Sequence, residues 1–295
     1  MKWVLGIGAE FDAVFDSLVA VRREMALSAG EESFTHLAYR QARRFDWDPA
    51  RAADFRQALA ERIVPLAMEL RAERCRILGK RLMQPWDAGC LVVHFPLARS
   101  TGARNLRLLA ETMFSALDSR LGEFFRRLDS QGRLDLGPSH QKQPSAFCAL
   151  FPDSGESLVS LSPGEDFTDV FSLAHEVGHA FAFEMARNHE PFEFKLPGRD
   201  VMEVHSVTLE HLAMASAERA LPGEQASALR NIRLLQTLEQ LPFLALSDAF
   251  HHHLYECPEA RTTSFDGIWA RLEARYQPGV DFSDVEEARF LIARL

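Results

Sequence analysis

The spacing of apolar positions predicts a chain that is mostly helical. Near the N-terminus, apolar residues recur at helical intervals, at Phe11, Val14, Phe15, Leu18 and Val19. Gly30 is a plausible end for this helix. A second helix is expected from Asp48 and Pro49, an N-cap followed by proline at the first helical position, to Gly79. Pro65 lies inside this helix and predicts a kink.

The pattern changes in the middle of the chain. Apolar positions between 106 and 128 predict one long amphipathic helix that ends before Gly132. Residues 133–164 are rich in Ser, Pro and Gly and contain two strand-like runs, SAFCALF at 145–151 and SLVSLS at 157–162. The turn sequence PDSGE separates them and predicts a β-hairpin. Helices are then expected at about 167–187, 201–219 and 223–257, with Pro242 inside the last, and two short helices follow near the end.

Composition narrows the class of protein. The chain has 295 residues, of which 47% are hydrophobic and 25% charged, and this is ordinary for a globular protein. A net charge of −9 argues against nucleic acid or an anionic membrane as a partner. We find no apolar stretch long enough to span a bilayer and only a short apolar run before Glu10, so neither a membrane protein nor a signal peptide is expected. The four cysteines form no CxxC pair, so we expect a reducing compartment, the cytoplasm.

The sequence SLAHEVGHAFAF, residues 172–183, carries the clearest candidate chemistry. His175 and His179 are four residues apart, so on a helix their Cβ atoms lie about 5–6 Å apart on one face and can bind one metal ion. Glu176 can reach a metal-bound water without being a ligand, which is the logic of the HExxH pattern in zinc peptidases. Gly178 lets another backbone or a substrate approach closely. A chance match is the alternative, but unpaired polar side chains in so apolar a helix would cost several kcal/mol.

A third metal ligand is expected from the sequence VMEVHSVTLEHLAM, residues 201–214. Glu203 and Glu210 are seven residues apart and therefore share a helix face, with Ser206 between them. One carboxylate can bind the metal while the other orients a ligand imidazole. A solvated acidic stripe is the alternative. We consider it weaker because apolar neighbours predict a well-buried helix, namely Val201, Val204, Val207, Leu209 and Leu212.

Several stretches together resemble the oligoendopeptidase F branch of the M3, thimet oligopeptidase-like zinc metallopeptidases. FTDVFSLAHEVGHAF resembles the zinc helix of that family, MEVHSVTLEHLA its segment with the glutamate ligand, and AFCALFPDSGESLVSLSPG the hairpin before the zinc helix. DAFHHHLYECPEAR, WARLEARYQPGVDFS and LGEFFRRLDSQGRLDL also resemble stretches of this branch. The resemblance extends over nearly the whole chain.

The resemblance implies a site and a fold. It makes His175, His179 and Glu203 the ligands of one Zn²⁺ per chain and Glu176 the general base and acid. Glu210, Ser206 and Asp169 become candidates for orienting the ligands. The implied fold is mainly α, a zincin-type helical catalytic domain with a small β-hairpin or sheet beside the HExxH helix. Residues 1–132 would form one side of a channel and 133–295 the zinc-binding catalytic region of the same continuous domain. The edge strand that holds a peptide would lie within 157–162, at Leu158, Val159 and Ser160.

The chain also departs from the family pattern. Pro144, Ser145, Ala146 and Phe147 stand where the family is usually glycine-rich, which would narrow or reshape the channel. Family members also have a longer N-terminal region and a C-terminal His- and Tyr-rich segment that stabilises the transition state. We therefore expect a chain shortened at both ends. The histidines at 251–253 are interpreted as a solvated face rather than a replacement for that segment.

The function expected from the sequence is a zinc-dependent metalloendopeptidase that hydrolyses short oligopeptides through a zinc-activated water, with Glu176 as the base. One alternative is a truncated, slow or inactive remnant that binds zinc and captures peptides. A second alternative uses the same His, His and Glu as a non-haem iron site. The expected partner is an oligopeptide, with no nucleic acid and no membrane. A separate chain that supplies the C-terminal segment is a further partner to consider.

Overall fold

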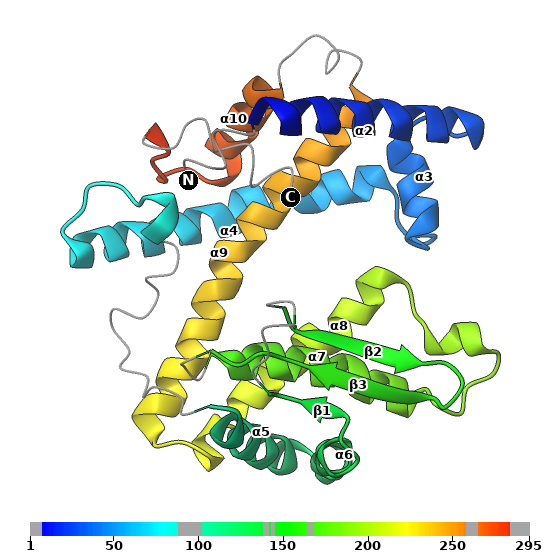
Figure 1. The fold of residues 1–295 in the computed structure, drawn as a ribbon. Helices are drawn as coiled ribbons and strands as arrows, with labels where there is room; N and C mark the ends of the chain where they lie inside the picture. The colour runs from blue at the N-terminus through cyan, green and yellow to red at the C-terminus, as the bar shows by residue number, and fades with distance from the viewer. Residues whose placement is uncertain are drawn as a thin grey trace. The chain divides into compact units, whose positions relative to one another are not determined.

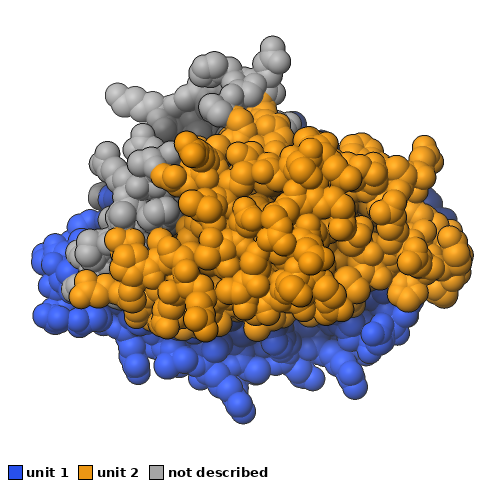
Figure 2. All heavy atoms as spheres, turned by 90° about the horizontal axis from the view of Figure 1, so that it is seen from below, with its two compact units in different colours: residues 1–91, 236–295 blue, residues 92–235 orange. Residues whose placement is uncertain are grey.

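The fold is known from a computed structural model that describes residues 8–87, 102–137, 142, 145–164, 168–257 and 265–283. The chain forms two compact units, shown in Figure 2. Unit 1 comprises residues 1–91 and 236–295, and unit 2 comprises residues 92–235. Cys90, Pro144 and the last of the short helices expected near the C-terminus lie outside the described residues.

Unit 1 is helical where it is described. It contains α2 (Gly8–Ser28), α3 (Phe34–Gln41), α4 (Pro49–Leu78), α10 (Phe265–Tyr276) and the later part of α9 (Gly223–Glu256). The expected N-cap is confirmed, since the Asp48 carboxylate accepts a hydrogen bond from the backbone of Arg51. Gly79 ends α4 in the left-handed conformation at φ 65°, as a C-terminal glycine should. The core of the unit contains Phe15, Val19, Leu59, Leu246, Phe250, Ile268 and Trp269.

The prediction of one long helix between residues 106 and 128 is wrong. The segment forms two helices, α5 (Ala103–Leu117) and α6 (Ser119–Ser130). Asp118 between them is extended, at φ −154° and ψ 130°, and its carboxylate accepts hydrogen bonds from the backbone of Arg120 and Leu121. This N-cap begins a new helix. The apolar period continues across the break, so hydrophobic spacing alone did not reveal it.

The β-hairpin is confirmed and belongs to a small sheet. Strand β2 (Phe147–Phe151) pairs antiparallel with β3 (Glu156–Ser160), and Gly155 makes the turn at φ +65°. Strand β1 (Leu134–Asp135) pairs parallel with β3, which gives the order β1-β3-β2. The prediction that the sheet edge lies within 157–162 is therefore wrong. β3 is the central strand, and β2 lies at an edge (Figure 1).

Two helices carry the candidate site in unit 2, namely α7 (Asp169–Met185) and α8 (Arg199–Ala215). The 3₁₀ turn η2 (Phe192–Lys195) lies between them in sequence, and η3 (Ala217–Arg219) follows α8. α7 packs against β2, β3 and α8. The inner face of α7 is fully buried. Its side chains there are apolar and small or medium-sized, so the sheet and α8 can pack closely against them. These core residues are Val170, Leu173, Ala174, Val177 and Ala180.

The prediction that α8 is a well-buried helix is wrong for its outer side. Leu209 is buried, but four other apolar side chains are exposed, namely Val201, Val204, Val207 and Leu212. Some of them border a hollow of about 830 Å³ that His179 also lines.

Among the described residues, no helix combines the length and the apolar character that a membrane crossing requires.

Candidate metal centre

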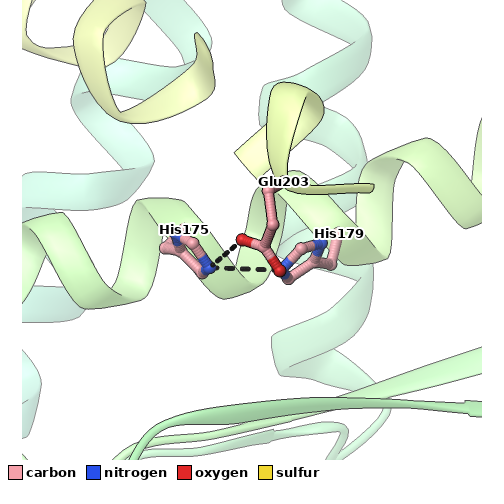
Figure 3. Close-up of side chains that lie close together, drawn as sticks. All are labelled: His175, His179 and Glu203. Atoms are coloured by element: carbon pink, nitrogen blue, oxygen red, sulfur yellow. Dashed lines mark hydrogen bonds and ion pairs between the residues drawn. The ribbon is translucent and has the colours of Figure 1, made fainter. Parts of the chain in front are cut away.

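Three side chains from α7 and α8 converge on one point. His175 and His179 lie on the same face of α7, and Glu203 reaches them from α8 (Figure 3). Nε2 of His175 lies 3.2 Å from Nε2 of His179 and 3.2 Å from Oε2 of Glu203. Nε2 of His179 lies 3.8 Å from Oε1 of Glu203. The sequence-predicted ligand set is therefore brought together by the fold.

These separations are close to those of a metal site. Zinc–nitrogen and zinc–oxygen bonds of about 2.0–2.2 Å at tetrahedral angles place neighbouring ligand atoms roughly 3.3–3.6 Å apart. The 3.2 Å between the two imidazole nitrogens lies near this range, and the distances of 3.2 and 3.8 Å to Glu203 run to different oxygens of its carboxylate. The donor set of two imidazoles and one carboxylate is one that catalytic zinc sites use, with the fourth position left for water or substrate. The side chain of Glu203 is 57% exposed, so solvent can reach the site from that side.

A hydrogen bond orients His175. Its Nδ1 lies 2.8 Å from Oε1 of Glu210, so the carboxylate accepts the Nδ1 proton and leaves the Nε2 lone pair for a metal. Glu210 is nearly excluded from solvent. The other carboxylate oxygen of Glu210 lies 2.7 Å from Nε of Arg233 on α9. The two side chains form an ion pair, but this contact does not have the geometry of a linear hydrogen bond. The predicted orienting role of Glu210 is consistent with these contacts.

Ser206 contacts Glu203. Its hydroxyl lies 3.1 Å from the backbone oxygen of Glu203 and 3.2 Å from Oε2 of the same residue, and the side chain is fully buried. Asp169 is placed differently, in the first turn of α7. Its carboxylate accepts a hydrogen bond of 2.6 Å from the backbone of Gly164 and so ties the preceding loop to the helix. An orienting role of Asp169 toward the ligands stays a prediction.

His179 has a buried nitrogen that the described residues leave unpaired. Its Nδ1 is excluded from solvent and has no hydrogen-bond partner among them. Burial lowers the pKa of this imidazole, and the neighbouring His175 lowers it further. The pKa of His175 is raised instead, mainly by its hydrogen bond to Glu210. A neutral His179 is the form that binds a metal.

Glu176 lies beside the ligands and is almost completely buried. Burial raises the pKa of its carboxyl above the ordinary value, and the negative charge of Glu203 adds to the increase. The backbone N–H of Cys148 on β2 donates a hydrogen bond to this carboxylate, which opposes the increase. A carboxylate with a raised pKa accepts a proton more readily than an ordinary one, as a general base must.

The backbone of β2 exposes hydrogen-bonding groups at the free edge. The backbone N–H of Val159 donates a hydrogen bond to the backbone oxygen of Arg133, on the β1 side of the sheet. Cys148 of β2 lies opposite Val159, and these two residues therefore form a pair without hydrogen bonds between them. By alternation, the backbone groups of Cys148 and Leu150 point away from β3. None of the described strands pairs with that edge. Because Cys148 also bonds Glu176, this edge adjoins the metal centre.

The predicted peptide-binding residues on β3 do not offer such an edge. Val159 is fully buried and Ser160 nearly so, and both pair with β1 as well as β2. Leu158 pairs with Ala149 of β2. The interpretation of 251–253 as a solvated face is also wrong. His252 is only 6% exposed, and its Nε2 lies 3.2 Å from the hydroxyl of Tyr39 in unit 1.

The fold and the site together define a mainly helical protein in which an HExxH helix lies against a small three-stranded sheet, with two histidines and a glutamate gathered at one point. Comparison with solved structures is more specific. The chain is similar to PZ peptidase A, with a TM-score of 0.86, 25% identity, and coverage of 99% of this chain and 51% of that chain. It is also similar to a protein from Bacillus anthracis strain Ames that is described as an oligoendopeptidase F, with a TM-score of 0.84, 25% identity, and coverage of 99% and 53%. The predicted resemblance to the oligoendopeptidase F branch is confirmed at the level of structure.

A further structure described as an oligoendopeptidase F has a TM-score of 0.87 and 26% identity over 98% of this chain and 50% of that chain. No family model and no curated protein matches the sequence. The chain spans about half the length of the solved structures to which it is similar.

Sequence reasoning missed two contributors to the site. Arg233 lies between apolar residues of α9 and carries no motif that would have indicated its ion pair with Glu210. Cys148 contributes through its backbone N–H, which no side-chain pattern records. The hairpin directly before the HExxH helix was the available signal, but it did not show which strand lies at the edge.

Proposed function

We propose that the protein is a zinc-dependent endopeptidase that hydrolyses short peptides. The observation that carries the proposal is the juxtaposition of three side chains, whose possible ligand atoms all lie within 4.8 Å of one another, with a buried carboxylate, that of Glu176, which is not part of this set. A purely structural zinc site is closed by four protein ligands and needs no base. The similarity to peptidases of the oligoendopeptidase F type supports the same conclusion.

His175, His179 and Glu203 would hold the zinc, which when bound supplies Lewis acidity and lowers the pKa of a coordinated water toward about 7. Glu176 accepts the proton of the attacking water, and its raised pKa suits this role. The same carboxyl then returns the proton to the leaving amine. Glu210 keeps the imidazole of His175 oriented throughout.

The free edge of β2 is our proposed peptide-binding element, in place of the residues on β3. An extended peptide can add a strand there through hydrogen bonds to the backbone carbonyl of Cys148 and to the backbone groups of Leu150. This arrangement would carry a substrate carbonyl past Glu176, because Cys148 already bonds that carboxylate. Only an unstructured chain can pair in this way. We therefore expect cleavage of short peptides and little cleavage of folded proteins.

A substitution of Glu176 tests the proposal directly. Glu176→Gln keeps the shape of the side chain and removes the base, so we expect zinc content equal to that of the parent and no measurable hydrolysis of a mixture of short peptides. Metal analysis of the purified parent also separates zinc from iron. Hydrolysis by the Gln variant at the parent rate would refute the assignment of the base, and bound iron in the parent would refute the assignment of the metal.

A second candidate function is peptide capture without efficient turnover. It would need only the free edge of β2, which can pair with an extended peptide without chemistry at the metal centre. One experiment distinguishes peptide capture from peptide hydrolysis. A capture protein binds peptides with equal affinity in the parent and in Glu176→Gln and releases no fragments, whereas an endopeptidase releases fragments in the parent alone.

A further inference from the structure

We propose that Arg233 is a positioning residue for the metal centre, which acts through Glu210 to hold His175 ready for the metal. This inference rests on the proposed zinc site and adds a residue from a third helix. The contacts form a continuous chain. Nε of Arg233 lies 2.7 Å from Oε2 of Glu210, and Oε1 of Glu210 lies 2.8 Å from Nδ1 of His175. Nε2 of His175 then faces Glu203 at 3.2 Å.

Burial makes this ion pair different from a surface pair. Exposed ion pairs contribute little because water and salt screen them. The side chains of Arg233 and Glu210 are only 11% and 6% exposed, so the attraction between them is weakly screened. If the arginine were removed, Glu210 would be left as a buried charge without its cation, and this is strongly unfavourable. The carboxylate would then rotate or relax toward solvent, and either change weakens its bond to His175.

The position of Arg233 also fixes the geometry. Its guanidinium lies over the ring of Phe171, at 5.9 Å from the ring centre, so it contacts α7 as well as α8. Both oxygens of Glu210 are engaged by different partners, which prevents the carboxylate from rotating about its own axis. The orientation of His175 therefore depends on a residue that touches neither the imidazole nor the proposed metal in the contacts described above.

The other imidazole makes this dependence stronger. Nδ1 of His179 has no hydrogen-bond partner among the described residues, so no comparable contact to these residues fixes its ring. Of the two imidazoles, the described residues hold only that of His175 by a hydrogen bond to its Nδ1. Loss of a residue that orients a ligand typically weakens metal binding by about 10–100-fold.

The experiment measures zinc affinity, by competition with a chromophoric chelator, in the parent and in Arg233→Met. We expect affinity about 10–100-fold lower in the variant. Arg233→Lys restores the positive charge without the guanidinium and should give an intermediate value. Arg230→Met is the matched control. Arg230 lies one turn earlier on α9 and pairs with Glu218 at 2.8 Å instead, so its removal should leave zinc affinity unchanged.

A double substitution separates positioning from a general structural effect. If Arg233 acts through Glu210, then Glu210→Gln combined with Arg233→Met should bind zinc no more weakly than Glu210→Gln alone, within about twofold. Two losses that multiply would show that Arg233 acts by another route and would overturn the proposal. The absorption spectrum of the Co²⁺-loaded protein gives a second measurement. It should change in Arg233→Met and remain unchanged in Arg230→Met.

The outcomes are distinguishable from failure of the proposed function. A parent protein that binds no zinc refutes the metal site itself. A parent that binds zinc with the same affinity as Arg233→Met refutes only the role of Arg233. If Arg233→Met does not fold, as judged by circular dichroism of the zinc-free protein, Arg233→Lys carries the test. It is then expected to bind zinc at least about fivefold more weakly, and affinity equal to that of the parent would overturn the proposal.

Discussion

Gly178 lies directly against the backbone of Ser206. A Cβ atom built at Gly178 would be 2.7 Å from Cα of Ser206 and 3.2 Å from the backbone oxygen of His205. Only glycine allows α7 and α8 to approach so closely. This approach brings Glu203, one turn before Ser206, to the two histidines of the HExxH helix.

The first prediction concerns this contact. Gly178→Ala must push α8 away from α7, because the atoms it meets belong to backbone and cannot rotate aside. We expect a loss of about 1–3 kcal/mol in the free energy of unfolding, the usual scale for overpacking. Zinc affinity should also fall, since Glu203 moves with α8. Chemical denaturation and chelator competition measure the two effects.

Gly223→Ala is the control for this substitution, because a Cβ there meets nothing within 4 Å. It should leave both measurements unchanged. If Gly178→Ala has the same zinc affinity and stability as the parent, the two helices can separate freely. The close contact would then not be what positions Glu203.

Much of this site could be predicted from the sequence, for a physical reason. His175, His179 and Glu176 are set by local helical geometry, and a spacing of four residues determines which face they share. The prediction of Glu203 as the third ligand required only the assumption that a second helix packs nearby. Arg233 and the edge position of β2 depend instead on contacts between segments far apart in the chain. Hydrophobic periodicity does not record such contacts.

The same distinction explains the other errors. Asp118 breaks the 103–130 segment because its side chain caps the second helix, while the apolar period runs on. The valines of α8 suggested burial because apolar residues are usually inside, yet several remain exposed on the outer side of α8. A pattern of residue types shows which faces are apolar, but it does not show whether another element covers them.

The second prediction concerns the metal ligands. His179→Ala removes one of the three proposed ligand atoms, and a zinc site with two protein ligands binds far more weakly. We expect the purified variant to lose most of its zinc. His189→Ala is the matched control, since His189 is exposed just beyond the end of α7. Full retention of zinc by His179→Ala would contradict the assignment.

The third prediction concerns the thiol of Cys148. Burial, with a further contribution from the charge of Glu176, raises the pKa of this thiol to about 12. The thiolate is the reactive form, and it appears only as the pH approaches this value. At pH 8, Cys148 should therefore resist alkylation by iodoacetamide in the folded protein and react once the protein is unfolded. Mass spectrometry of peptides that contain Cys148 measures both rates. Equal rates in the folded and unfolded protein would contradict the packing of β2 against α7.

The last prediction distinguishes the two kinds of backbone position on β2. The N–H of Leu150 points to the free edge, whereas that of Ala149 points into the ladder with Leu158. Proline lacks this N–H and is tolerated on edge strands where the donor faces outward. We expect Leu150→Pro to fold with a melting temperature close to that of Leu150→Ala, which controls for the lost side chain. We expect Ala149→Pro to lower the melting temperature by several degrees, because it breaks a ladder hydrogen bond.

The consequence for peptides follows from the same geometry. If a peptide adds a strand to β2, Leu150→Pro removes one hydrogen bond to the bound substrate and should raise KM or the peptide dissociation constant by about 3–10-fold, the equivalent of one net hydrogen bond. Zinc content should not change, because Leu150 is not among the ligand residues. The comparison with Leu150→Ala uses peptide binding by fluorescence anisotropy, so it remains informative whether or not turnover is fast. Equal affinity of Leu150→Pro and Leu150→Ala would show that the peptide does not pair with this edge.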